Sequence, residues 1–291
     1  MKCNNLLKIL FFLIIITIEA VHAVEFQKKS ALVIGNSRYK TYPLSSPIHD
    51  AEFISRSLKD IGFNVQHERD IDSLSMKLKI KEFTLELNKN TLGLFYYSGY
   101  AVQLNGINYL IPVNTNIKSS DDVTSNGIKI DTIISHFKEA KNKFNMIILD
   151  ASRDYPPARS ILGFTQGLAF THAPSETFIA FSTAPGNVTS DNKHKHSLFS
   201  SSIANNIRIP SIKVGDLFQN IYSSVLLTSK GLQTPWISNS LEDTFYLFYL
   251  SEQEKILAEK KRKAEEARRL AEEQRKAEEA RRLAEEQRKA E

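Results

Sequence analysis

Cysteine is almost absent from this chain of 291 residues. The single cysteine, Cys3, lies in a segment that we expect to be removed on export, so the mature protein would contain none. This absence excludes disulfide bonds, thiolate metal sites and any reaction that uses a cysteine nucleophile. Stability must come from an ordinary hydrophobic core, and a composition with 42% hydrophobic and 24% charged residues is sufficient to form one.

A basic surface of the kind that binds nucleic acid is also lacking. The formal charge of +5 is modest for this length, and no basic stripe alternates with exposed aromatic residues, so we expect no nucleic-acid partner. His194 and His196 with Asp191 come nearest to a metal-binding pattern. Two histidines and an aspartate in a lysine-flanked loop are more often a plain loop than a metal site. We therefore predict neither a metal nor a cofactor.

The N-terminus has the features of an export signal. Lys2 and Lys8 precede an apolar run from Ile9 to Ile18, and the segment Val21-His22-Ala23 has small residues where signal peptidase needs them. The apolar run is too short to span a bilayer comfortably. We predict a signal peptide over residues 1–23, a secreted or periplasmic location, and no stable membrane span after cleavage. The alternative is an uncleaved anchor.

The hydrophobic pattern of residues 24–250 predicts one α/β domain. Short apolar runs typical of strands alternate with segments whose apolar residues recur every three or four positions, as in helices. Such alternation implies right-handed crossovers, a mainly parallel sheet and helices on both of its faces. The predicted strands are 30–35, 63–67, 92–101, a hairpin over 102–113, 144–149, 177–183 and 244–250, and the predicted helices are 47–61, 74–88, 130–140, 198–207 and 214–228.

Polar residues follow two of these strands at the point where each ends. Asp150 and Ser152 come after the buried run 144–149, and Tyr100 ends the run that starts at Leu92. In open α/β sheets, ligands bind in the crevice beyond the carboxyl ends of the strands. We therefore expect Tyr100 and Ser152 to face one crevice.

These two stretches resemble the active-site strands of the caspase-like cysteine peptidases, in particular the bacterial relatives of metacaspases. In that family the first strand ends Tyr-Tyr-(Ser/Ala)-Gly-His-Gly and the second ends Asp-Ala-Cys-Arg. Other segments follow the family's order: 31–36 with Tyr39, 47–51, 108–113, 181–186 and 233–236. The resemblance covers residues 30–250 and implies a large-subunit-like part over about 30–155 and a small-subunit-like part over about 170–250.

This chain departs from the family at its catalytic residues. Tyr100 stands at the position of the catalytic histidine, Ser152 at that of the nucleophilic cysteine, and Ala101 at that of the glycine that follows the histidine. Ala101 still offers a backbone N–H for an oxyanion, although its Cβ narrows the pocket. A serine needs a base to take its proton, and a phenol with an ordinary pKa near 10 is a poor base. The resemblance with these changes implies a pseudoenzyme.

The alternative is an active endopeptidase that uses Ser152 as its nucleophile. Such an enzyme would need another base near the serine hydroxyl. The candidate histidines are His49, His172, His194 and His196.

Two carboxylates indicate that a binding site could outlast catalysis. In metacaspase-like members, an aspartate two residues before the nucleophile and another on the first helix form an acidic pocket, and the matching residues are Asp150 and Asp50. A pair of carboxylates favours a guanidinium. The expected partner is therefore a peptide or protein with exposed arginine or lysine. The alternative is structural, with Asp50 complementing a helix N-terminus and Asp150 capping a strand end.

The composition changes at Ser251, where a charged segment begins. A unit of 13 residues occupies 263–275 and repeats at 276–288, with acid-first pairs such as Glu272 and Lys276 that stabilise helices. At about 100° per residue the apolar stripe rotates by about 140° from one unit to the next, which favours a solvated spacer helix over a coiled coil. A third possibility is that the chain is a structural or spacer protein of the cell envelope, in which the helix over residues 251–291 carries the function.

Overall fold

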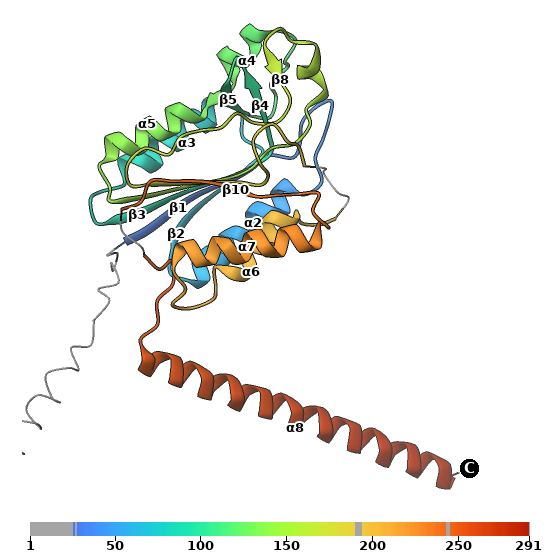
Figure 1. Ribbon diagram of the computed structural model, residues 1–291. Coiled ribbons are helices and arrows are strands. Elements are labelled where there is room, and N and C mark those ends of the chain that lie inside the picture. The colour runs from blue at the N-terminus through green and yellow to red at the C-terminus, as the bar shows by residue number, and fades with distance from the viewer. Residues whose placement is uncertain (1–25, 27, 190–193, 243–244, 291) are drawn as a thin grey trace, which may run out of the picture. The chain divides into compact units, whose positions relative to one another are not determined.

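The computed structural model describes residue 26 and residues 28–189, 194–242 and 245–290 (Figure 1). The predicted signal peptide, residues 1–23, lies outside the described residues. Contacts within the described chain divide it into two units, with the boundary between Phe248 and Tyr249.

The first unit is built on a six-stranded sheet with the order β10-β9-β7-β3-β1-β2. Five strands are mutually parallel and β10 runs antiparallel to β9 at one edge. The strands are β1 (Lys28–Gly35), β2 (Asn64–Arg69), β3 (Thr91–Ser98), β7 (Phe144–Asp150), β9 (Thr177–Phe181) and β10 (Trp236–Asn239). The paired residues Ser98 and Asp150 end β3 and β7 side by side, which sets the edge where the candidate site lies.

Helices cover both faces of this sheet, as Figure 1 shows. One face carries α2 (Pro47–Asp60), α6 (Leu198–Asn206) and α7 (Val214–Thr228), and the other carries α3 (Ser73–Leu85) and α5 (Ile130–Ala140). Because both faces are covered, β3 and β7 are buried at every residue and read as continuous apolar runs. The predicted α/β class with a mainly parallel sheet is confirmed.

A smaller antiparallel sheet, in the order β6-β5-β4-β8, stands beyond the main sheet. Asn105 and Gly106 both have positive φ and join β4 to β5 in the predicted hairpin. Its strands are β4 (Tyr100–Leu104), β5 (Ile107–Ile111), β6 (Ile128–Lys129) and β8 (Phe164–Thr165), and the short helices α4 (Ser120–Asn126) and η1 (Pro156–Ser160) lie in the connections.

Two of the predicted strands need correction. The run 92–101 is not one strand, because β3 ends at Ser98 and Tyr100 begins β4 in the second sheet. The predicted strand 244–250 is wrong: Thr244 lies outside the described residues, Tyr246 makes a single bridge to Lys213, and Phe245 and Leu247 pack into the core without a partner strand. The edge strand is β10 instead.

The second unit contains one long helix, α8 (Glu252–Ala290), of 39 residues. Its described side chains are largely exposed and include ion pairs of Glu259 with Lys263 and of Glu272 with Lys276. Within the described part of the chain, no helix combines the length and the apolar character that crossing a membrane requires.

Candidate functional site at a buried arginine

Asp50 is carried to the carboxyl edge of the sheet by the first turn of α2. Pro47 starts the helix, and Asp50 donates its N–H to the Ser46 carbonyl at 2.8 Å. The helix begins very close to the end of β1, since a Cβ at Gly35 would lie 2.5 Å from the Pro47 oxygen and 2.7 Å from the Ala51 Cβ. A glycine at position 35 therefore allows the approach that buries Asp50 completely.

Asp150, the last residue of β7, faces the N-terminus of α6. Its Oδ2 accepts hydrogen bonds from the hydroxyls of Ser197 and Ser200, the latter at 2.6 Å. Ser200 also exchanges a hydrogen bond of 2.6 Å with the buried Tyr96 hydroxyl. Ser197 caps α6 through the Ser200 N–H and donates its own N–H to Asp50 Oδ1 at 2.9 Å. One helix start thus joins the two carboxylates.

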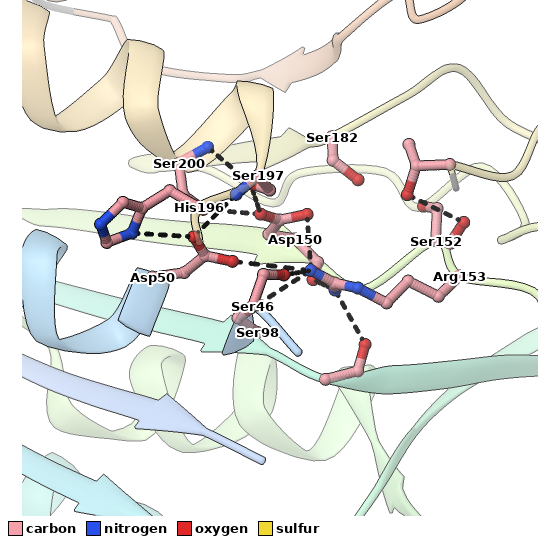
Figure 2. A network of polar contacts seen from close by, with 12 residues as sticks. Ser46, Asp50, Ser98, Asp150, Ser152, Arg153, Ser182, His196, Ser197 and Ser200 are labelled. Atoms are coloured by element: carbon pink, nitrogen blue, oxygen red, sulfur yellow. Dashed lines mark hydrogen bonds and ion pairs between the residues drawn. The ribbon is translucent and has the colours of Figure 1, made fainter. Parts of the chain in front are cut away.

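The guanidinium of Arg153 lies between these carboxylates (Figure 2). Nη2 is 3.7 Å from Asp50 Oδ2 and 3.5 Å from Asp150 Oδ1, and it donates to the Ser46 and Ser98 hydroxyls at 3.3 and 3.2 Å. Nη1 donates to the carbonyls of Gly99, at 3.0 Å, and Asp150. The side chain is only 3% exposed. The structure therefore brings Asp50 and Asp150 together around a cation that belongs to this chain.

The electrostatic balance of this network is incomplete, because one guanidinium faces two buried carboxylates. Burial raises the pKa of Asp50 from its ordinary value of 3.8 to about 7, and repulsion by Asp150 acts in the same direction. Attraction to Arg153 and the N–H of Ser197 oppose the rise of this pKa without cancelling it. Asp50 is therefore partly protonated near neutral pH.

His196, which precedes α6, lies at the solvent side of the network. Its Nδ1 is 3.5 Å from Asp50 Oδ1, and its ring stands 5.0 Å from that of Phe53 and 6.2 Å from that of His49. Partial burial and the nearby Lys195 lower the pKa of His196. In Figure 2 it lies at the opposite end of the network from Ser152, with the Arg153 side chain between them. This geometry does not make His196 a base for Ser152.

Ser152 is buried, with 2% of its surface exposed. Its carbonyl accepts hydrogen bonds from the Thr189 N–H at 2.7 Å and the Thr189 hydroxyl at 3.4 Å, and Thr189 forms a parallel bridge with Arg153. The segment that follows β9 therefore lies directly on the residues that follow β7.

Tyr100 is 4% exposed and its ring is held between two others. Ring centroids lie 4.7 Å away for Tyr39 and 4.6 Å away for Tyr155. The backbone of Tyr100 is also fixed, because its N–H donates to the Tyr39 hydroxyl at 3.0 Å and its carbonyl accepts from the Tyr97 hydroxyl at 3.1 Å. The phenol belongs to the hydrophobic cluster of the smaller sheet.

Ala101 is adjacent to Tyr100, and its N–H donates to the Ala151 carbonyl at 3.2 Å. This bond joins the start of β4 to the residue before Ser152, so the Tyr100 and Ser152 segments are neighbours. The N–H that was expected to remain available for an oxyanion is engaged within the chain.

Several residues of this network were not predicted from the sequence. Arg153 was missed, although two aspartates expected in a buried place require a nearby cation. Ser197 and Ser200 carried no signal beyond a possible helix cap. Of the loop residues that come nearest to a metal-binding pattern, Asp191 lies outside the described residues and His194 is exposed, as is the separate His172. Among the described residues, no group of three histidine, cysteine or acidic side chains is arranged to hold a metal ion.

Comparison with known proteins identifies the architecture. The family profile described as Caspase domain matches residues 28–246. The human mucosa-associated lymphoid tissue lymphoma translocation protein 1 is 28% identical over 160 residues, which are 53% of this chain and 19% of that protein, and its mouse homologue gives the same values. The matched part is thus about a fifth of those relatives. The crystal structure of caspase-1 from Spodoptera frugiperda superposes with a TM-score of 0.58 at 16% identity, covering 78% of this chain and 94% of that one.

Proposed function

This chain belongs to the caspase domain family, and on that premise we propose that its globular domain has lost peptidase activity and acts by binding peptide or protein. The observation that carries the proposal is the state of Tyr100. A residue at the position of the catalytic histidine must reach the nucleophile and exchange protons. The Tyr100 ring packs between those of Tyr39 and Tyr155 in an apolar cluster, and a phenol does not replace an imidazole as a proton acceptor near neutral pH.

The chemistry at the nucleophile position supports the same conclusion. Ser152 replaces the thiol, and a serine attacks a carbonyl only when a base removes its proton. The histidine of the network, His196, contacts Asp50 rather than Ser152. The N–H of Ala101, which an oxyanion would need, donates a hydrogen bond to the Ala151 carbonyl. The Tyr100 ring and the Ala101 N–H are therefore engaged in packing and in a bond within the chain.

Binding remains as the function because the recognition residues are still present. Asp50 and Asp150 are buried, adjacent and oriented toward a common cation. This arrangement fits a peptide or protein with exposed arginine or lysine as the ligand. The N-terminal signal features support a periplasmic or secreted location for this activity.

Activity measurements test the loss of catalysis. The purified chain, its Ser152→Ala variant and an active caspase-like peptidase would be compared on fluorogenic peptides carrying Arg, Lys, Asp or Ala before the scissile bond. We expect no turnover above the Ser152→Ala background and no labelling by serine-directed electrophiles. Turnover that disappears in Ser152→Ala would show that the chain is an active endopeptidase.

A reconstructed variant tests the same proposal from the other side. Tyr100→His with Ser152→Cys restores the two catalytic groups, and Ala101→Gly widens the oxyanion pocket. If only these groups are lost, the triple variant should react with a thiol-directed peptide electrophile, although slowly because the surrounding contacts have changed. A folded variant that stays inert would mean that the divergence extends beyond these three residues.

The helix α8 favours an additional role as a spacer. It extends for 39 residues with exposed, oppositely charged side chains paired along its length. Such pairs stabilise a helix that has no packing partner. We propose that it separates the binding domain from whatever its far end contacts.

A further inference from the structure

The acidic site of this domain already contains a guanidinium. We propose that Arg153 is an internal ligand of the Asp50–Asp150 site, and that a guanidinium from a partner enters only by displacing it. This inference rests on the proposed binding role of the same site. It identifies Arg153 as the group that a partner's guanidinium must replace.

The contacts of Arg153 are those of a bound ligand more than of an ordinary surface ion pair. Its guanidinium makes four hydrogen bonds, to the carbonyls of Gly99 and Asp150 and the hydroxyls of Ser46 and Ser98. It also pairs with both carboxylates. The side chain is 3% exposed and occupies the position between the two carboxylates, so a second guanidinium has to replace it there. Occupation by Arg153 and by a partner are mutually exclusive.

The charges define which ligands the site can accept. Two buried carboxylates without a cation would repel each other in a poorly solvated place. The carbonyls of Gly99 and Asp150 and the hydroxyls of Ser46 and Ser98 also accept from the guanidinium, so these contacts, like the two carboxylates, offer it acceptor oxygens. A planar cation with several N–H donors meets these requirements, and the ligand class is therefore a guanidinium: an arginine side chain, agmatine or the free ion.

The backbone links Arg153 to the segment after β9. The N–H of Arg153 donates to the Ala151 carbonyl at 2.8 Å, while Thr189 holds the carbonyl of Ser152 and bridges to Arg153. Withdrawal of Arg153 would disturb this short turn and its bonds with Thr189. Exchange of the internal for an external guanidinium would therefore release Thr189 from Ser152.

A purely structural ion network predicts that removing Arg153 is harmful, and so does the internal-ligand proposal. The two differ in what repairs the damage. A vacated guanidinium site should be refilled by free guanidinium, whereas a network that needs the tethered side chain should not respond to it. Binding of a ligand to the native state raises Tm in a saturable manner.

The experiment measures Tm of the full chain and of Arg153→Ala, with Arg159→Ala as the matched control. Arg159, six residues after Arg153, is exposed and pairs with Asp154, so its removal reports the general effect of removing an arginine. The probe is guanidinium chloride at low millimolar concentration, with sodium chloride at equal ionic strength as reference. We expect Tm of Arg153→Ala to fall and then to rise by about 4 °C at about ten times the dissociation constant. Native protein and Arg159→Ala should not respond.

The double variant Asp50→Asn/Arg153→Ala completes the test. It removes the titratable group at position 50, so it should be more stable than Arg153→Ala above neutral pH, where Asp50 would have to ionise beside Asp150, and it should respond less to guanidinium. If Arg153→Ala is insoluble, it should refold with guanidinium and the double variant should be soluble without it. Absence of the guanidinium response in folded Arg153→Ala, or a double variant as defective as the single one, would overturn the proposal.

Peptide binding separates this inference from the proposed function. An Arg-containing peptide should bind Arg153→Ala more tightly than the native chain, by about tenfold or more, because the internal competitor is gone. A guanidinium response without peptide binding would support the internal ligand and contradict the binding role. Equal peptide affinity of the native chain and Arg153→Ala would show that the peptide binds elsewhere and would overturn the exchange.

Discussion

Replacing Asp50 by asparagine should remove a pH dependence of stability that this residue creates. Asparagine keeps the size of the side chain and can still accept from the Ser197 N–H, but it does not titrate. In the native chain, the pKa of Asp50 is raised from 3.8 to about 7 in the folded state, mainly by burial and then by Asp150. A folded protein that binds this proton more tightly than the unfolded chain is stabilised at low pH, and it loses that stabilisation as the pH rises from about 4 to about 7.

The magnitude follows from the two pKa values. A difference of one pH unit corresponds to about 1.4 kcal/mol, so the full effect is at most about 4 kcal/mol, of which about 2 to 3 kcal/mol falls between pH 5 and pH 8. The charged groups that face Asp50 are Asp150 and Arg153 from the end of β7 and His196 from the loop before α6. The pKa of His196 is lowered, so its own contribution has the opposite sign and is lost as the pH falls.

Denaturant unfolding at several pH values between 5 and 8 measures this difference. The free energy of unfolding of the native chain, relative to Asp50→Asn, should fall as the pH rises. Glu52→Gln in the same helix is the control, because Glu52 pairs with Arg56 at the surface. Repeating the comparison in a His196→Gln background isolates Asp50 from the histidine. A difference between native chain and Asp50→Asn that stays constant, or that grows with pH, would refute the reasoning.

Two further predictions concern packing and the tail. Gly99→Ala should destabilise the domain by about 1 to 3 kcal/mol, because a Cβ there would lie 2.5 Å from the Tyr97 hydroxyl and 2.7 Å from the Tyr39 hydroxyl. The control is Gly215→Ala, because a Cβ at position 215 meets no atom within 4 Å. Equal unfolding midpoints of the two variants would contradict the prediction. The isolated segment 251–291 should be helical by circular dichroism and monomeric in sedimentation at micromolar concentration, because its apolar stripe rotates by about 140° per unit. A stable dimer would contradict this prediction.

The layered fold could be predicted because hydrophobic periodicity reports burial directly. The runs at β3 and β7 are buried along their whole length, and the helix from Pro47 shows its apolar residues on one face. The pairing of strands is not reported by hydrophobic periodicity. Phe245 and Leu247 alternate like a strand and are buried, yet no strand lies beside them, because a core position needs only apolar neighbours whereas a strand needs a free sheet edge.

The positions of the site residues could be predicted, but the contacts of their side chains could not. Asp50 and Asp150 were expected either to share an acidic pocket or to serve separately at a helix start and a strand end, and the structure places both at the carboxyl edge of the sheet. The occupant of the space between them depends on the turn after β7, which directs the Arg153 side chain back to the Asp150 carbonyl and to that of Gly99, the residue after β3. Local sequence does not specify that reversal, since an arginine after a buried strand can equally extend into solvent.

The length of α8 sets how far apart its two ends are held. At a rise of about 1.5 Å per residue, its 39 residues extend for roughly 58 Å. The same number of residues as a flexible coil would have an average end-to-end distance of roughly 34 Å and would visit short distances often. A rigid helix therefore lowers the effective concentration of any group at one end as experienced by a group at the other. Two groups held at opposite ends of this helix would therefore encounter molecules in solution more readily than they encounter each other.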